Sequence, residues 1–265
     1  YDLEPIDRMR LEFDPNIKLA TTESLSATYV GFNVLKPPFD NLLVRQAINY
    51  AIDVAPLVEV IFEGQAVQAF GPLSSNVFGA HTELEPYEYD PAKARQLLTQ
   101  AGYPNGFKTS IWTNYNPLRM PVAAVLQQNL QDIGIDATVE IKEWGAYLEE
   151  TGAGMHDMFI LGWVTVTADA DYGLYALFHS SQHGSSGNRT FYTNERVDEL
   201  LDYARSTSDQ EARLAAYHEV QEILREEAPW VFLLFPYDIH GMRSNIDGFV
   251  PHPAGHHFLG RVTKN

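Results

Sequence analysis

The 265-residue sequence contains no cysteine, and its apolar residues nowhere form the run of about 18 that a membrane helix requires. Without cysteine, disulfide bonds and thiolate metal sites are excluded. The absence is compatible with a cytoplasmic protein and with an exported one, so it does not decide the compartment. Internal repeats and low-complexity segments are also lacking.

Basic residues are scarce, since 18 Lys and Arg stand against 35 Asp and Glu, and the formal net charge is -17. This charge repels nucleic acids and anionic membranes, so we expect no nucleic-acid partner. Hydrophobic residues make up 45%, enough for one large domain or two small ones. The sequence opens at Tyr1, and residues 1–10 lack the pattern of a signal peptide. We therefore expect a processed precursor or a piece of a longer protein.

Residues 156–180 contain the most informative stretch. The apolar run from Met158 to Leu161 has no polar alternation, which predicts a strand buried on both faces. Gly162 and Trp163 are expected to end this strand, and residues 164–171 are then small, hydroxyl-bearing or acidic. Open α/β sheets bind ligands at the carboxyl ends of their strands, so a binding site is predicted here.

Hydrophobic periodicity between residues 107 and 161 predicts the order strand, helix, strand, helix, strand. Such β-α-β units have right-handed crossovers and parallel strands. All three strands then direct their carboxyl ends to one edge, where the loops 113–117, 142–145 and 163–171 should converge. The fold class is predicted to be α/β, with a mixed, mostly parallel sheet flanked by helices.

The remaining segments are predicted from alternation, caps and turn residues. Strands are expected at 17–21, 29–33 and 230–235, and residues 65–88 are expected to form an ordered surface loop. Helices are expected over 3–11 and 53–64, and others should be capped by Asp40, Asp90, Asn194 and Asp209.

Several longer strings carry a family resemblance: YVGFN at 29–33, PPFDNLLVRQAINYAID at 37–53, YDPAKARQLLTQAGYPNGF at 89–107, HDMFILGW at 156–163, NRTFYTNERVDELLD at 188–202 and VQEILREEAPW at 220–230. In this order they resemble the extracytoplasmic solute-binding proteins of peptide-type ABC importers. That group includes receptors for dipeptides, oligopeptides, glutathione and nickel chelates. Each string alone is weak evidence, but together they span nearly all of the chain.

The resemblance implies a lobe of the periplasmic-binding-protein type (type II, peptide-receptor class). Family members are about twice as long and close two lobes around a buried ligand. Residues 1–265 resemble the carboxyl-terminal lobe with its hinge-side strands, and the amino-terminal lobe would precede Tyr1. We therefore expect a monomeric receptor for a short peptide or peptide-like solute. It would be periplasmic or extracytoplasmic, tethered to the membrane or free, and would deliver its solute to the membrane permease of an ABC importer.

The resemblance also suggests ligand-binding residues. Trp163 would supply an apolar wall, Arg119 would pair with a ligand carboxylate, and hydrogen bonds or an amino-group contact would come from Asn116, Thr165, Thr167, Asp169 and Asp171. Dipeptide and oligopeptide receptors of the family place an Asp where this chain has Val166. The dipeptide receptors place an Arg near the position of residues 112–114, which read Trp-Thr-Asn here. Simple dipeptide specificity is therefore not implied.

Structural roles compete with these ligand roles. Trp163 could plug the end of the sheet, Asp169 and Asp171 could cap a turn, and Arg119 could be a solvated residue in the first turn of a helix.

Other functions are weighed against this one. The same fold could carry a nickel chelate or an oligosaccharide. A metal-assisted hydrolase is the alternative from another class, but the sequence has no HExxH and no G-x-S-x-G motif. His252, His256 and His257 lie in a segment rich in Pro and Gly, and we expect solvated histidines there rather than a metal site. We expect neither catalysis nor a cofactor.

Overall fold

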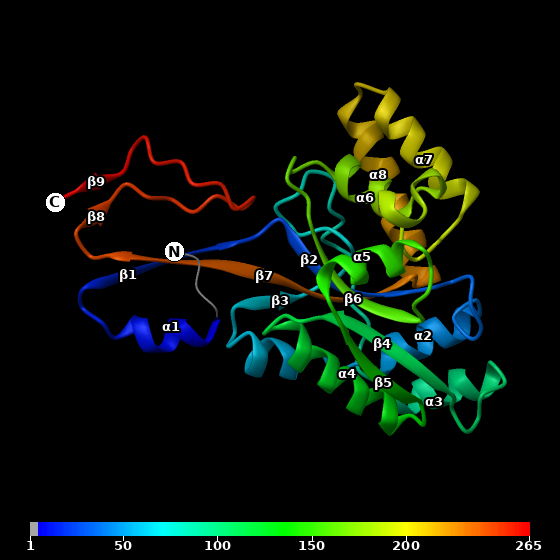
Figure 1. Ribbon diagram of the computed structural model, residues 1–265. Helices are drawn as coiled ribbons and strands as arrows, with labels where there is room; N and C mark the ends of the chain where they lie inside the picture. The colour runs from blue at the N-terminus through cyan, green and yellow to red at the C-terminus, as the bar shows by residue number, and fades with distance from the viewer. Residues whose placement is uncertain (1–4) are drawn as a thin grey trace.

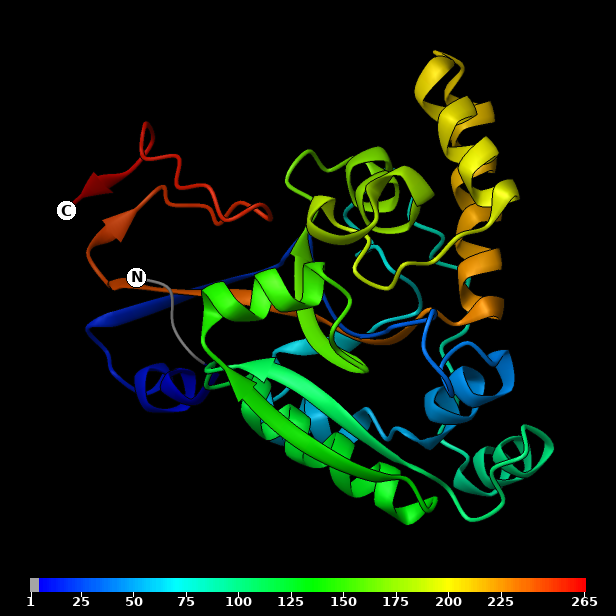
Figure 2. The same ribbon diagram turned by 45° about the vertical axis from the view of Figure 1, so that its right-hand side comes forward.

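The computed structural model describes residues 5–265, and within them seven strands form one sheet in the order β1-β7-β2-β6-β4-β5, with β3 paired to β7 (Figure 1). Helices cover both faces of this sheet, as Figure 2 also shows. The strands are β1 (Ile17–Glu23), β2 (Ser26–Phe32), β3 (Ala66–Gln68), β4 (Lys108–Asn114), β5 (Asp136–Lys142), β6 (Met158–Val164) and β7 (Trp230–Arg243).

The helices carry the labels of Figure 1. The α-helices are α1 (Pro5–Glu12), α2 (Leu42–Ala51), α3 (Pro91–Gln100), α4 (Arg119–Asp132), α5 (Trp144–Gly152), α6 (Ala170–Phe178), α7 (Glu195–Ser206) and α8 (Gln210–Glu227). Short helical turns of other types are η1 (Leu57–Ile61), η2 (Ser180–Gln182) and η3 (Gly184–Ser186), and a separate two-stranded ribbon joins β8 (Ile246–Asp247) to β9 (Thr263–Lys264). No helix among residues 5–265 is long and apolar enough to cross a membrane.

The predicted β-α-β-α-β unit is confirmed. Strand β4 pairs in parallel with β5 on one side and with β6 on the other, and α4 and α5 are the crossover helices. The sheet is mixed, as predicted, but it is not mostly parallel. The pairings β1-β7, β7-β2, β2-β6 and β3-β7 are all antiparallel. The prediction failed there because local periodicity does not show which distant strands become neighbours.

Three element boundaries also differ from expectation. Strand β6 does not stop at Gly162, because β2 pairs with it as far as Ser26 opposite Val164. Asn41, not Asp40, caps α2. Instead of a full helix over 53–64, the structure has the short η1, in which Val60 is exposed. Helix α1 overlaps the predicted 3–11 helix, although Leu3 lies outside the described residues.

Other predicted helix starts are confirmed. Asp90 accepts a hydrogen bond from the backbone N–H of Lys93, and Pro91 occupies the first turn of α3. Asn194 caps α7 and Asp209 caps α8, each through two backbone N–H groups.

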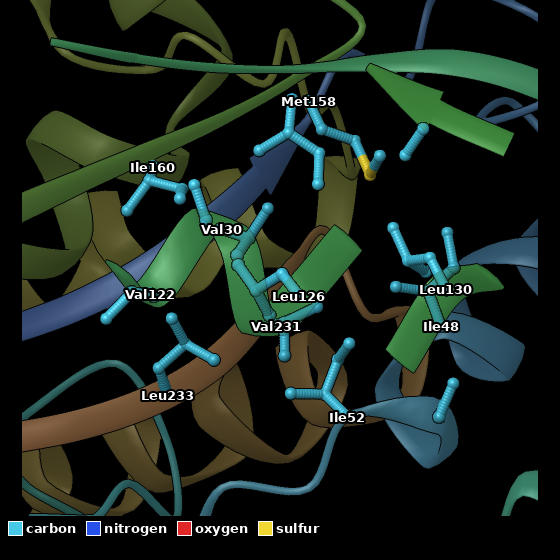
Figure 3. Close-up of a cluster of buried hydrophobic side chains, with 14 of the residues drawn as sticks. Val30, Ile48, Ile52, Val122, Leu126, Leu130, Met158, Ile160, Val231 and Leu233 are labelled. Carbon is cyan, nitrogen blue, oxygen red and sulfur yellow. The ribbon is translucent and has the colours of Figure 1, made fainter. Parts of the chain in front are cut away.

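A hydrophobic core lies on each face of the sheet. One core joins α2, α3 and α4 to the sheet; Figure 3 shows part of it, with Val122, Leu126 and Leu130 of α4 facing Val30 and Ile160. The other core joins α5, α6, α7 and α8 to the opposite face, where Tyr29 stacks on Trp230 with ring centroids 3.4 Å apart. Because β6 contributes Met158 and Ile160 to one core and Phe159 and Leu161 to the other, it is buried on both faces as predicted.

A two-stranded ribbon extends from the sheet. Residues 237–243 of β7 continue beyond the helical layers and pair only with β1 among the described residues (Figure 1). We call residues 5–23 and 237–265 the arm. It carries exposed apolar side chains, which are Phe13, Val250, Phe258 and Leu259.

Candidate functional site

The carboxyl ends of β4, β5 and β6 lie at one edge of the sheet. Asn114 at the end of β4 is opposite Lys142 at the end of β5, and Trp112 is opposite Phe159 of β6. The residues that follow these strands are 115–119, 143–145 and 165–172. Together with Asn114, Trp163 and Val164 we call them the rim. The parallel pairing of the three strands brings these segments to the same edge, where Arg119 contacts Trp144.

Arg119 connects the three segments of the rim. Its Nη1 donates a hydrogen bond of 2.8 Å to Oδ1 of Asn114, and its guanidinium lies 5.9 Å from the ring centroid of Trp144. On β6, a Cβ at position 162 would lie 3.5 Å from Nη2 of Arg119, so the guanidinium lies beside Gly162. The first turn of α4 thus directs this cation over the ends of β4 and β6.

Arg119 is half-buried, and its charge has no carboxylate partner among residues 5–265. Burial lowers the pKa of Arg119, and within the described part of the chain the ionisable groups that act against this are Tyr147 and Tyr29. Burying a cation without a counter-ion is costly, so an anion from outside would be bound favourably here. Arginine suits a carboxylate, because its planar guanidinium can donate two parallel hydrogen bonds.

The rim also carries aromatic and aliphatic side chains. Trp163 is half-buried and packs on Tyr172, with ring centroids 5.2 Å apart, and its Nε1 is buried without a hydrogen-bond partner among the described residues. Large apolar groups on the rim remain exposed: Tyr115 at 81%, Trp144 and Val166 at 45% and Val164 at 41%. Grouped exposed apolar side chains are typical of binding surfaces.

Three predicted ligand residues have backbone or packing roles. Oδ1 of Asn116 accepts hydrogen bonds from the backbone N–H groups of Leu118 and Arg119, and so holds the turn that leads into α4, the helix that carries the guanidinium. Thr165 is buried, and its Oγ1 would lie 2.9 Å from a Cβ at position 173. Thr167 is exposed, and its hydroxyl interacts with the backbone of Asp169.

The two predicted carboxylates already have arginine partners. Asp169 caps α6 through the N–H of Asp171 and binds Nη2 of Arg213 at 2.9 and 3.1 Å. Asp171 lies 3.0 Å from Nε of Arg205, and burial raises the pKa of its carboxyl group. These pairs tie the start of α6 to α7 and α8. A contact of either carboxylate with a ligand remains a prediction.

One supporting segment was not identified from the sequence as part of the site. Residues 71–81 belong to the predicted ordered loop, but the loop also joins the rim: Phe78 donates to the carbonyl of Ala168 and accepts from the N–H of Ala170, both at 2.9 Å. Tyr172 was likewise missed. A run such as SSNVFGA has no periodicity that would indicate which distant segment it supports.

Histidines and carboxylates do not gather into a metal site. Among residues 5–265, no group of three or more His, Cys, Asp or Glu side chains could hold a metal ion. In the tail, His252 and His256 pack on each other and on Phe258. The rim therefore offers one cation, several aromatic surfaces and hydrogen-bonding groups, which suits binding of an organic anion.

Comparison with known proteins also indicates similarity to proteins that bind solutes. Residues 1–185 match the family described as "Bacterial extracellular solute-binding proteins, family 5 Middle". The chain is 34% identical to heme-binding protein A of Haemophilus influenzae over 257 residues, which is 94% of this chain and 46% of that protein. It is 37% identical to the glutathione-binding protein GsiB of Escherichia coli over 246 residues, which is 90% of this chain and 48% of that protein.

Among solved structures, the chain resembles the periplasmic binding protein DppA of Helicobacter pylori in complex with the peptide STSA. The TM-score is 0.88 at 38% sequence identity, with 98% of this chain and 51% of that chain covered. The chain thus spans about half the length of the relatives that it matches.

Proposed function

Because the chain belongs to the bacterial extracellular solute-binding proteins of family 5, we propose that it forms the carboxyl-terminal ligand-binding lobe of an ABC importer receptor. The solute would be a short peptide or a peptide-like molecule with a carboxylate. The lobe would bind this solute at the rim, and the whole receptor would deliver it to the membrane permease.

The proposal rests on the burial of Arg119 and on the groups that contact its guanidinium. A half-buried guanidinium without a carboxylate partner among residues 5–265, framed by Asn114 and Trp144, is an electrostatic arrangement that an anionic ligand would complete. On the same rim, Trp163 and Tyr172 would give an apolar wall for a side chain or the peptide backbone. The proposed contacts are thus a carboxylate on Arg119 and an apolar group on Trp163.

The domain organisation is part of the proposal. The rim provides only one wall, and we propose that an amino-terminal lobe in the full-length receptor provides the other. The arm supports this, because its ribbon of β1 and β7 leaves the sheet and its flanking segments carry the exposed Phe13, Val250 and Leu259. Closure of two lobes would remove the solute from water, which strengthens both the ion pair and the apolar contact.

The relatives reported above are named for binding and not for catalysis, so the family consists of receptors rather than enzymes, and the metal-assisted hydrolase is not supported. The family is described as extracellular, which supports a role of this protein outside the cytoplasmic membrane. Docking on a permease, membrane tethering and a monomeric state are expectations for the full-length receptor.

A thermal-shift screen of the full-length receptor tests the proposal. A ligand that binds only the folded state raises the melting temperature by mass action. We expect short peptides or glutathione-like compounds to raise it, and calorimetry should then give one site per receptor. If only an oligosaccharide or a nickel chelate stabilised the receptor, the peptide assignment would be wrong while the receptor fold stood. Peptide hydrolysis with stoichiometric zinc would instead favour the hydrolase.

A further inference from the structure

A pair of stacked histidines holds the loop 71–81 against α8, away from the groups assigned above. The rings of His81 and His218 lie 4.2 Å apart and nearly parallel, at 18°. Nε2 of His81 lies 3.2 Å from Oε1 of Glu222, one turn further along α8. His81 is buried and His218 is half-buried.

Gln221 reinforces the same contact. Its Nε2 donates to the carbonyl of Gly79 at 2.7 Å, and its Oε1 accepts from the N–H of His81 at 3.2 Å. Gly79 has a φ of +93°, and a Cβ there would lie 2.7 Å from Cβ of Ala170, so the loop passes very close to both α8 and α6. We call His81, His218, Gln221 and Glu222 the clasp.

The clasp is mechanically connected to the rim. Phe78, three residues before His81, makes the two backbone hydrogen bonds to Ala168 and Ala170 that hold the rim segment 165–172. From α8, Arg213 reaches Asp169 on the same segment. Release of the loop would therefore remove one of the supports of the rim segment that follows Trp163.

We propose that the clasp is a proton-sensitive device: mild acid adds a charge to His218 of the stacked pair, frees the loop 71–81 and loosens the rim wall behind Trp163. The inference adds a form of regulation to the proposed function, and its meaning for solute capture rests on that function. Solute would be held most firmly near neutral pH and released more readily in acid.

The charged groups around the histidine pair determine whether acid favours the held or the freed loop. Glu222 on α8, Glu83 beyond the loop and a backbone hydrogen bond with Ala80 favour a proton on His218, whereas His81 opposes it. Arg225 on α8 is directed away, to the carbonyl of Glu85. Burial first, and then His81, lower the pKa of His218. The freed loop exposes His218 at an ordinary pKa of about 6.5, so the freed state binds the proton more tightly.

This difference in proton binding between the held and the freed loop sets the pH dependence of the clasp. The clasp contributes fully above about pH 6.5, and its contribution falls as the pH drops below that value. With one extra proton bound in the freed state, the opening equilibrium constant should rise by up to about tenfold per pH unit.

Hydrogen exchange measured by mass spectrometry tests the clasp without any ligand. In the full-length receptor, protection factors corrected for intrinsic rates should fall on the order of tenfold in residues 71–81 and 165–172 between about pH 7.5 and 5.5. In His218→Phe, which keeps a stacked ring that cannot titrate, the change should be less than about twofold. His256→Gln, at an exposed histidine of the arm, should behave as the wild type.

Two outcomes would overturn the proposal: protection independent of pH in the wild type, or an equal loss in His218→Phe. If His218→Phe does not fold, as judged by circular dichroism, His218→Gln serves in its place with the same expectation. Because this readout needs no solute, a wrong assignment of the solute would not affect it. Calorimetry of a bound peptide at the same two pH values then tests the connection to the rim, and unchanged affinity would contradict it.

Discussion

Oδ1 of Asn114 accepts a hydrogen bond from Nη1 of Arg119 at 2.8 Å, which pairs the guanidinium with a neutral amide where a carboxylate would complete an ion pair. Asn114→Asp would supply that carboxylate from within the chain. We expect it to compete with an anionic solute and to weaken binding by about tenfold or more, because a tenfold change corresponds to about 1.4 kcal/mol. Calorimetry measures this, and Asn105→Asp in an exposed loop is the charge-matched control. Equal affinities in both variants would contradict the role of Arg119.

Substitutions of Trp163 test whether its side chain forms an apolar wall of the binding site. Trp163→Ala should lower solute affinity by about 10-fold to 100-fold, since stacked aromatic contacts are among the strongest at binding sites. Trp163→Phe keeps an aromatic surface, and so should lose less. Calorimetry on the full-length receptor compares the two. Wild-type affinity in Trp163→Ala would show that this side chain only closes the end of the sheet.

Substitution of Asp169 should mainly lower the stability of the fold. Asp169→Ala removes both the cap of α6 and the pair with Arg213, and we expect a loss of about 1–2 kcal/mol in the free energy of unfolding. Asp169→Asn can still cap, and should lose less than about 1 kcal/mol. Urea denaturation measures both. Should Asp169→Asn or Asp171→Ala fold normally and yet lose solute affinity, the carboxylate in question contacts the ligand directly.

His156 predicts a pH dependence of stability. It is fully buried among Trp112, Phe159 and Phe191, and burial lowers its pKa to about 3. The unfolded chain takes up a proton near pH 6.5 and the folded chain does not. This contribution to stability is thus complete above about pH 6.5 and is lost as the pH falls toward 3, by up to about 1.4 kcal/mol per pH unit.

Urea denaturation between about pH 7 and 4.5 should therefore show a smaller pH slope in His156→Leu than in the wild type, whatever the absolute stability of the variant. His183→Gln changes an exposed histidine and should keep the wild-type slope. An unchanged slope in His156→Leu would show that His156 is charged in the fold.

The parts of the fold that depend on local patterns could be predicted from the sequence. The strand Met158–Val164 is apolar on both faces, and α4 and α5 follow strands with clear alternation, so the parallel unit and the convergence of its loops were correct. The predicted end of β6 was wrong because its partner β2 begins at Ser26, 132 residues before β6 begins at Met158. Pairing between such distant strands leaves no local signal.

The same limit applies to the candidate site. Trp163 and Arg119 were identified from their positions after a buried strand and at the start of a helix, together with the family resemblance. The partners of Asp169 and Asp171 are Arg213 of α8 and Arg205 of α7, which come close only through packing of α6 against α7 and α8. Sequence patterns therefore located the acidic residues but could not show that arginines already neutralise them.

Arg119 is proposed to receive the carboxylate of the solute. Comparing the binding of a peptide with that of its carboxyl-amidated form tests this role most directly. In the full-length wild-type receptor, the free acid should bind at least about tenfold more tightly than the amide. In Arg119→Gln this ratio should fall to near one, while Arg95→Gln, at an exposed arginine of α3, should keep it. A ratio in Arg119→Gln equal to that of the wild type would contradict the account.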